Sequence, residues 1–270
     1  MGQFDYRWEE VFGMEEDVKE LTHLSLFSGI GGLDLAAEWA GFRTVGQCEW
    51  ADYPRAVLEK HWPGLPRWRD IRTLTKESFY EQTGLRTVDI ISGGFPCQPF
   101  SVAGKRGGKE DDRYLWPEML RVIWELQPAW VIGENVSGLI RIALDEILSG
   151  LSEAGYEARV YSSEARNVGG LFRGERIAIV AASNDRSPPV WRDGEFSPNA
   201  EITGCWDYNR GGAEKPYLWK RREFESRPYG VGYGVPNRVD RLKCLGNAVV
   251  PQQFYPIFKA IAEELRRVDT

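Results

Sequence analysis

The segment LTHLSLFSGIGGLD, residues 21–34, sets the start of the fold. Its first seven residues are largely apolar and predict a strand, while residues 33–39 predict a helix that ends near Gly41. The glycine-rich turn between them could let a ligand approach the backbone at the amino terminus of the helix. A dinucleotide-binding turn would carry a third glycine at position 34. Asp34 stands there instead, which argues against a pyrophosphate ligand.

Strand and helix patterns alternate outward from this turn. Further strands are expected at residues 43–48, 88–92, 130–133 and 176–182. Further helices are expected at residues 53–61, 116–126, 139–154 and 254–267. This alternation predicts an α/β fold with a parallel sheet and helices on both of its faces.

The pattern breaks near residue 183. Residues 183–238 are rich in glycine, proline and asparagine and hold nine aromatic residues, nine Lys or Arg and eight Asp or Glu. We therefore expect a small irregular region there, separate from a main domain at residues 21–182. Residues 1–20 are interpreted as an amino-terminal arm. Residues 239–270 are interpreted as a carboxy-terminal segment that packs back on the main domain.

Composition narrows the class of protein. Hydrophobic residues make up 42% and charged residues 27%, which is typical of a globular chain. The sequence has no apolar run near the roughly 20 residues of a membrane span and no signal-peptide pattern, so a cytoplasmic protein without a membrane segment is expected. The four cysteines form no C-x-x-C pair and the two histidines lie near none of them, so no metal site is predicted.

The net charge of −6 does not by itself favour a nucleic-acid partner. Basic residues nevertheless gather in two places, residues 105–113 and residues 183–238. DNA could meet these two regions while the acidic surface faces away.

An acid and an aromatic residue follow the second expected strand. Glu49 lies eighteen residues after Gly31, where a carboxylate can accept hydrogen bonds from ribose hydroxyls. Trp50 beside it could stack on a base. Together they fit an adenosine ligand without a diphosphate; the alternative is an ordinary tight turn with a surface acid.

Two further motifs end strands. The run GGFPCQPFS, residues 93–101, places Cys97 at the carboxyl end of a strand, where open α/β sheets bind ligands. The basic, glycine-rich residues 102–114 could form a lid over a polyanion. The run VIGENV, residues 131–136, ends the next strand with Glu134. The alternatives are a buried structural cysteine and an exposed acid beside a helix cap at Asn135.

Taken together, the motifs LFSGIGG at residues 26–32, PCQ at 96–98, ENV at 134–136 and GNAVVP at 246–251 resemble the cytosine-C5 DNA methyltransferase family of bacteria and phages. The resemblance covers nearly all of the chain outside residues 1–20 and 183–238. It implies a Rossmann-like S-adenosylmethionine-dependent methyltransferase sheet with residues 183–238 as a small irregular target recognition domain.

The resemblance also implies a role for each matching residue. Cys97 matches the nucleophile, Glu134 the acid beneath the cytosine, and Arg176 the second arginine of the Gln-x-Arg-x-Arg segment. Residues matching the cofactor site are Phe27, Gly29, Ile30, Gly31, Gly32, Glu49, Trp50, Asp70, Ile71 and Asn247. Expected DNA contacts are Gln98, Ser101, Lys105, Arg106, Arg173, Lys220, Arg221 and Arg222.

The chain departs from the family in one segment. Phe172 stands where the family has glutamine and Gly174 where it has the first arginine, and Arg173 could replace that arginine from one place earlier.

The function expected from the resemblance is DNA cytosine-C5 methylation through a covalent Cys97 adduct. The enzyme would act as a monomer on a flipped-out cytosine in duplex DNA, and would convert S-adenosylmethionine to S-adenosylhomocysteine. It would serve restriction-modification, with a cognate endonuclease as a partner, or phage DNA protection. Two alternatives stay open: a tRNA cytosine-C5 methyltransferase, and a catalytically silent DNA-binding paralogue.

Overall fold

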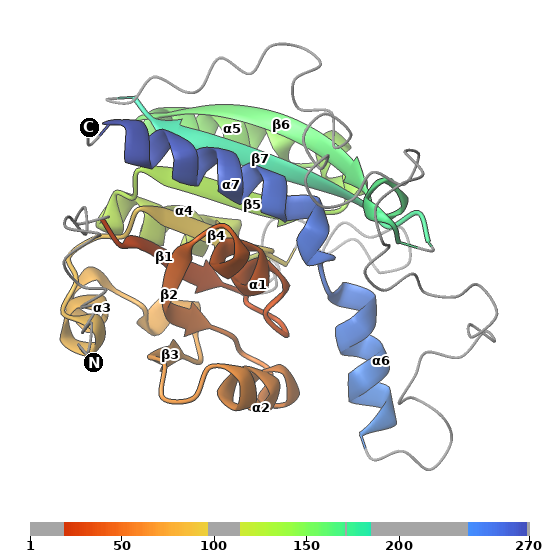
Figure 1. The fold of residues 1–270 in the computed structure, drawn as a ribbon. Helices are drawn as coiled ribbons and strands as arrows, with labels where there is room; N and C mark the ends of the chain where they lie inside the picture. Colours follow the sequence, from red (N-terminus) through yellow and green to blue (C-terminus); the bar gives the residue numbers. More distant parts are fainter. Residues whose placement is uncertain (1–18, 97–113, 171, 185–236, 269–270) are drawn as a thin grey trace, which may run out of the picture.

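The computed structural model describes residues 19–96, 114–170, 172–184 and 237–268, which form a seven-stranded sheet with helices on both faces (Figure 1). The strand order is β3-β2-β1-β4-β5-β7-β6. The strands are β1 (Leu21–Leu26), β2 (Phe42–Cys48), β3 (Arg67–Trp68), β4 (Ile90–Gly93), β5 (Trp130–Asn135), β6 (Tyr156–Glu164) and β7 (Glu175–Ser183). The expected α/β fold is confirmed.

One edge of the sheet differs from the expected parallel arrangement. The strands from β3 to β5 are parallel, but β7 runs antiparallel to both β5 and β6. The physical reason is the short link between β6 and β7, which contains only the 3-10 helix η5 (Ala165–Val168). Two strands joined without a crossover helix pair antiparallel.

Helices cover the sheet in two layers. On one face, α1 (Gly32–Trp39) and α7 (Pro251–Val268) bury residues such as Ala36 and Phe258 against the sheet. On the other face, α3 (Lys76–Thr83), α4 (Trp116–Leu126) and α5 (Leu144–Glu153) bury Phe79, Val122 and Ile147. The sheet is thereby buried on both sides, as parallel sheets usually are.

Other elements depart from the sequence prediction. The helix expected at residues 139–154 is divided into the 3-10 helix η4 (Ser137–Arg141) and α5. The strands β3 and β6 and the helices α3 and α6 (Arg238–Asn247) were not predicted as separate elements. Helix α6 extends away from the sheet and buries none of its own residues (Figure 1).

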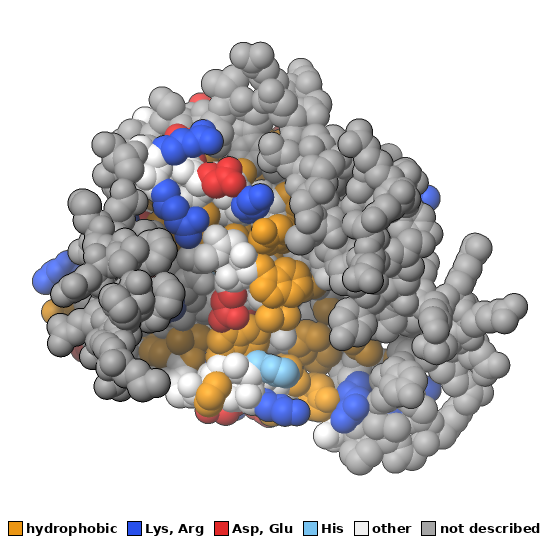
Figure 2. All heavy atoms as spheres, in the orientation of Figure 1, with side chains coloured by type: hydrophobic (Ala, Val, Ile, Leu, Met, Phe, Trp, Pro, Cys, Tyr) orange, Lys and Arg blue, Asp and Glu red, His pale blue; other side chains and the backbone are white. Residues whose placement is uncertain are grey.

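The remaining helix of the parallel half is α2 (Asp52–His61), which follows β2. No helix within the described ranges is long and apolar enough to cross a membrane. In the space-filling view, hydrophobic side chains gather in the middle of the face, with Lys and Arg side chains above and below them (Figure 2).

Candidate functional site

A broad, open cleft lies at the carboxyl ends of the parallel strands. The loops after β1, β2, β3 and β4, the end of β5 and the end of α6 all contribute to its wall. Examples from each are Phe27, Glu49, Asp70, Phe95, Glu134 and Asn247. Open α/β sheets bind their ligands at this edge, so the fold alone marks the cleft as the candidate site.

The glycine-rich turn forms one wall of the cleft. Phe27 has a φ of 52°, in the left-handed region that few residues other than glycine adopt, and Gly31 has a φ of 90°. A Cβ atom on Gly32 would lie 2.7 Å from the carbonyl oxygen of Val249. The turn therefore packs directly on the segment that follows α6, and Gly29, Ile30 and Gly32 face the cleft.

Glu49 connects this turn to the loop after β2. One carboxylate oxygen accepts a hydrogen bond from the Gly29 N–H at 2.9 Å, and the other accepts one from the Ala51 N–H at 2.8 Å. Each oxygen keeps a second acceptor position for a ligand. Glu49 thus takes part in the turn and also lines the cleft.

Trp50 lies beside Glu49 with 63% of its surface exposed. The guanidinium carbon of Arg69 lies 5.6 Å from the centre of the Trp50 ring, within the range of a cation–π contact. Arg69 also forms an ion pair with Asp52 at 2.8 Å. A large aromatic surface is thus open to the cleft.

Asp70 and Ile71 start the 3-10 helix η2 (Ile71–Thr73). The Asp70 carboxylate accepts a hydrogen bond from the Arg72 N–H at 3.0 Å. The Ile71 side chain belongs to the hydrophobic core, and the residue is only 3% exposed. Both residues line the cleft, but Ile71 has little more than its backbone to offer a ligand.

Glu134 and Arg176 face each other across the pairing of β5 with β7. The Arg176 Nε lies 2.9 Å from the Glu134 Oε1, and their side chains are 16% and 11% exposed. Burial raises the pKa of Glu134 to about 7, and the positive charge of Arg176 only partly opposes this shift. The site therefore holds a carboxyl group that carries a proton for much of the time at neutral pH.

The loop after β4 packs against this carboxyl group. A Cβ atom on Gly94 would lie 2.6 Å from the Glu134 Oε2, and the Asn135 side-chain amide donates a hydrogen bond to the Phe95 carbonyl at 3.0 Å. The alternative of a helix cap at Asn135 with an exposed acid is wrong, because Asn135 ends β5 and Glu134 is buried. Pro96, the last described residue of this loop, also lines the cleft.

Several expected site residues lie outside the described residues. They are Cys97, Gln98, Ser101, Lys105, Arg106, Lys220, Arg221 and Arg222. Asn247 is described; it ends α6, is exposed and lines the cleft.

The structure does not support Arg173 as a replacement for the missing first arginine. Its guanidinium contacts Glu164 at 2.8 Å and Glu175 at 3.5 Å, and within the described part of the chain it does not line the cleft. Phe172 is exposed, and a Cβ atom on Gly174 would collide with its ring. The Arg173 guanidinium is thus engaged with Glu164 and Glu175, whereas Arg176 of the same segment contacts Glu134.

Two residues that support the site were missed by sequence reasoning. The buried Gln253 side chain of α7 donates hydrogen bonds to the carbonyls of Ser163 at 2.8 Å and Gly174 at 3.0 Å, which fixes the link that leads to Arg176. Arg121 of α4 reaches the loop that carries Asp70 and Ile71. Both act on carbonyls distant in sequence, so no local pattern marks them.

Comparisons with known proteins identify the family of the chain. A family model described as C-5 cytosine-specific DNA methylase matches residues 21–226. The Type II methyltransferase M.PspPI of a Psychrobacter species is 36% identical over 191 residues, which cover 67% of this chain and 44% of the relative. The Type II methyltransferase M.BsuFI of Bacillus subtilis is 33% identical over 231 residues, which cover 82% of this chain and 53% of the relative. The chain thus spans about half the length of these relatives.

Solved structures agree on the fold. A crystal structure described as a DNA modification methyltransferase of an Escherichia coli prophage superposes with a TM-score of 0.54 and 25% identity, over 62% of this chain and 47% of that one. The Spodoptera frugiperda DNMT2 structure superposes with a TM-score of 0.54 and 23% identity, over 64% of this chain and 53% of that one.

Proposed function

Because the chain belongs to the C-5 cytosine-specific DNA methylase family, we propose that it transfers a methyl group from S-adenosylmethionine to C5 of a cytosine in duplex DNA. The observation that carries the proposal is the buried Glu134–Arg176 pair, which lies in the same cleft as the glycine-rich turn and beside the loop that leads to Cys97. A role in Type II restriction-modification or phage DNA protection is proposed from the relatives.

The cleft residues fit the proposed cofactor. Glu49 has free acceptor positions for the two ribose hydroxyls, and the exposed Trp50 ring offers a stacking surface for adenine. The Asp70 carboxylate could accept a hydrogen bond from the adenine amino group. The Ile71 N–H could donate one to a ring nitrogen, because the first N–H groups of a helix have no partner within it. Bound S-adenosylmethionine would supply an electrophilic methyl group on a sulfonium centre.

The protein must make cytosine C5 nucleophilic, which the free base is not. In the proposed reaction the Cys97 thiolate adds to C6, and the ring becomes an enamine whose C5 forms the bond to the methyl group. Glu134 donates its proton to N3 as the sulfur–carbon bond forms, and its raised pKa suits this role. Arg176 stabilises the negative charge at O2. S-adenosylhomocysteine would be left once C5 has taken the methyl group. A base then takes the C5 proton, Cys97 is expelled from C6 as a thiolate, and N3 returns its proton to Glu134.

The base must leave the duplex to reach Glu134. The Glu134 carboxyl is buried in the cleft, where a cytosine stacked inside DNA cannot reach it. The nucleotide must therefore be flipped out of the duplex. We assign closure behind the flipped base to the segment of sequence that contains Gln98, Ser101, Lys105 and Arg106. Target recognition is assigned to residues 183–238, including Lys220, Arg221 and Arg222. These assignments rest on the sequence resemblance.

The proposal is tested by incubating the purified chain with radiolabelled S-adenosylmethionine and either mixed-sequence duplex DNA or tRNA. The DNA is then analysed by bisulfite sequencing, and DNA binding is measured separately. We expect radiolabelled methyl groups in the DNA, and cytosines that resist bisulfite conversion within one short sequence context. Label in tRNA and none in duplex DNA would replace the DNA substrate with an RNA substrate. DNA binding without label in either would indicate a catalytically silent paralogue. Exchanging residues 183–238 for those of a relative should change the methylated context if this region recognises the target.

A further inference from the structure

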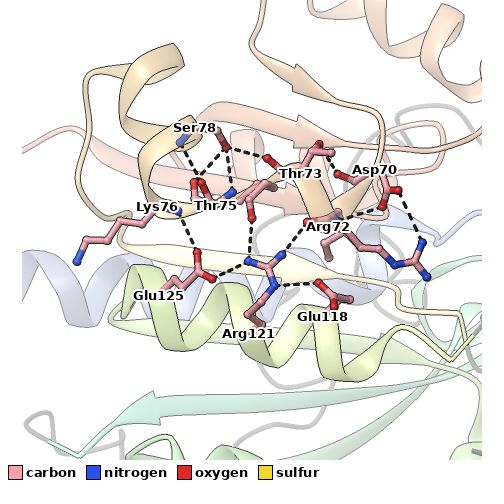
Figure 3. A network of polar contacts seen from close by, with 11 residues as sticks. Asp70, Arg72, Thr73, Thr75, Lys76, Ser78, Glu118, Arg121 and Glu125 are labelled. Atoms are coloured by element: carbon pink, nitrogen blue, oxygen red, sulfur yellow. Dashed lines mark hydrogen bonds and ion pairs between the residues drawn. The ribbon is translucent and has the colours of Figure 1, made fainter.

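Arg121 on α4 makes four polar contacts and has no role in the reaction proposed above. Its guanidinium donates to the carbonyls of Ile71 at 2.8 Å and Leu74 at 3.1 Å (Figure 3). It also bonds the carboxylates of Glu118 at 2.8 Å and Glu125 at 2.7 Å. With its side chain 29% exposed, Arg121 is more enclosed than an ordinary surface ion pair.

The two carbonyls lie at opposite ends of η2. Ile71 is its first residue, and Leu74 directly follows its last residue. A cation that bonds a carbonyl at the carboxyl end of a helix stabilises that end, as Arg121 does at Leu74. The acidic partners orient the guanidinium, and Glu125 also accepts the N–H of Lys76 at 2.9 Å, at the start of α3. Arg121 and Glu125 thus fasten both ends of residues 71–76 to α4.

Among the described residues, the polar contacts of Asp70 itself are with its near neighbours in sequence. Its carboxylate bonds the Arg72 N–H, and its carbonyl accepts from the Thr73 hydroxyl at 2.7 Å. These bonds shape η2 but do not fix where it sits relative to the cleft. The bonds from Arg121 span 47 and 50 residues and provide that fixed reference.

We propose that Arg121 is a positioning residue for adenine recognition, which holds the Asp70–Ile71 edge in register with the cleft. This inference rests on the proposed function, since it assumes that adenine binds against Asp70 and Ile71. Within the described residues Arg121 does not line the cleft, so it acts through η2 rather than on the ligand. Two hydrogen bonds to one ring require both partners in place at once, so a small displacement of η2 weakens both.

The test compares S-adenosylhomocysteine with its hypoxanthine analogue, in which an oxygen replaces the adenine amino group. Calorimetric titration of the wild-type chain should show clear preference for the adenine ligand. Arg121→Met keeps the apolar stem of the side chain and removes all four polar contacts. We expect it to weaken adenine-ligand binding about tenfold, as for loss of one good hydrogen bond, and to change hypoxanthine-ligand binding much less.

Glu118→Gln is the matched control, because Glu118 bonds Arg121 whereas Glu125 also holds the start of α3. It removes a charge from the same network but leaves both bonds from Arg121 to the carbonyls of η2. This variant should lose stability while its preference for adenine is kept. If Arg121→Met does not fold, Arg121→Lys provides the test, because an ammonium cannot repeat the planar set of four contacts and preference should fall partway.

The outcomes separate the two proposals. Absence of S-adenosylhomocysteine binding by the wild-type chain would contradict the proposed function. Wild-type binding together with an unchanged adenine preference in a folded Arg121→Met or Arg121→Lys variant would overturn only the role of Arg121.

Discussion

Arg176 Nε lies 2.9 Å from Glu134 Oε1, across the antiparallel pairing of β7 with β5. The pair combines a carboxyl group that burial keeps partly protonated with a cation that is always charged. One group can donate a proton and the other can hold developing negative charge. This division of roles explains how a single wall of the cleft could act on both the N3 atom and the exocyclic O2 atom of a cytosine.

The raised pKa of Glu134 predicts a pH-dependent stability. Folding raises this pKa from 4.5 to about 7, so the folded state binds the proton more tightly. The resulting stabilisation is full below pH 4.5 and is lost as the pH rises to 7, amounting to roughly 3 kcal/mol at about 1.4 kcal/mol per pKa unit. Urea unfolding of wild type and Glu134→Gln at pH 5 and pH 8 measures it.

Wild type and Glu134→Gln must be compared because Glu134 is not the only buried acid. Burial also raises the pKa of Asp34, to about 6, and this group contributes a similar trend in both proteins. The difference in unfolding free energy between pH 5 and pH 8 should therefore be smaller in Glu134→Gln than in wild type. Equal differences in the two proteins would show that Glu134 does not titrate in this range.

Removing Arg176 should change both the rate and the pH profile. The loss of one charge-stabilising donor costs on the order of a hundredfold in kcat, so Arg176→Gln should be about that much slower. Since Arg176 lowers the pKa of Glu134, the variant should keep Glu134 protonated to higher pH. The falling alkaline limb of the kcat profile should then shift upward in pH. If Arg176→Gln is slower but the alkaline limb of its kcat profile is unshifted, Arg176 does not lower the pKa of Glu134.

Glu49 should be needed for the cofactor more than for DNA. Glu49→Ala removes the acceptors for the Gly29 and Ala51 N–H groups as well as the proposed ribose contact. We expect S-adenosylhomocysteine affinity to fall about ten- to hundredfold, as for a charge-assisted hydrogen bond. Calorimetry on Glu49→Ala and on the exposed control Glu81→Ala checks this. Equal affinities in the two variants would assign Glu49 to the turn alone.

The packing of the glycine-rich turn gives a stability prediction. The added methyl group of Gly32→Ala would lie 2.7 Å from the Val249 carbonyl oxygen and would push the two segments apart. Overpacking of this kind costs about 1–3 kcal/mol. Gly138→Ala is the control, because a Cβ there has no neighbour within 4 Å. Thermal unfolding should show a clear loss for Gly32→Ala alone; matching midpoints would mean that the turn and residue 249 can separate freely.

Elements whose residues show a clear apolar or helical spacing were predicted correctly from the sequence. The first strand, the turn and α1 follow from an apolar run, glycines and helical spacing, and β1 and α1 begin and end within one residue of the expected positions. Strand β6 was missed because it lies at the edge of the sheet and most of its residues are only partly buried. Helix α6 was missed because it buries no residue and so carries little apolar periodicity.

Local patterns predicted where several candidate site residues lie in the chain, but not the contacts that they make. Glu134 could be placed at the end of a strand from its neighbours in sequence. Its burial and its ion pair with Arg176 depend on the antiparallel pairing of β5 with β7, which no local pattern specifies. The bonds from Arg121 to η2 also join segments about 50 residues apart.

Covalent capture tests the proposed mechanism most directly. A duplex in which 5-fluorocytosine replaces every cytosine should be incubated with the chain and S-adenosylmethionine, then separated under denaturing conditions. Fluorine at C5 blocks the final elimination, so the account predicts a stable complex with the mass of protein, DNA strand and one methyl group. The Cys97→Ser variant should bind the DNA but form none, because its hydroxyl is hardly ionised near neutral pH. Methylation by the wild-type chain without any such complex, or an equal complex with Cys97→Ser, would contradict a covalent Cys97 adduct.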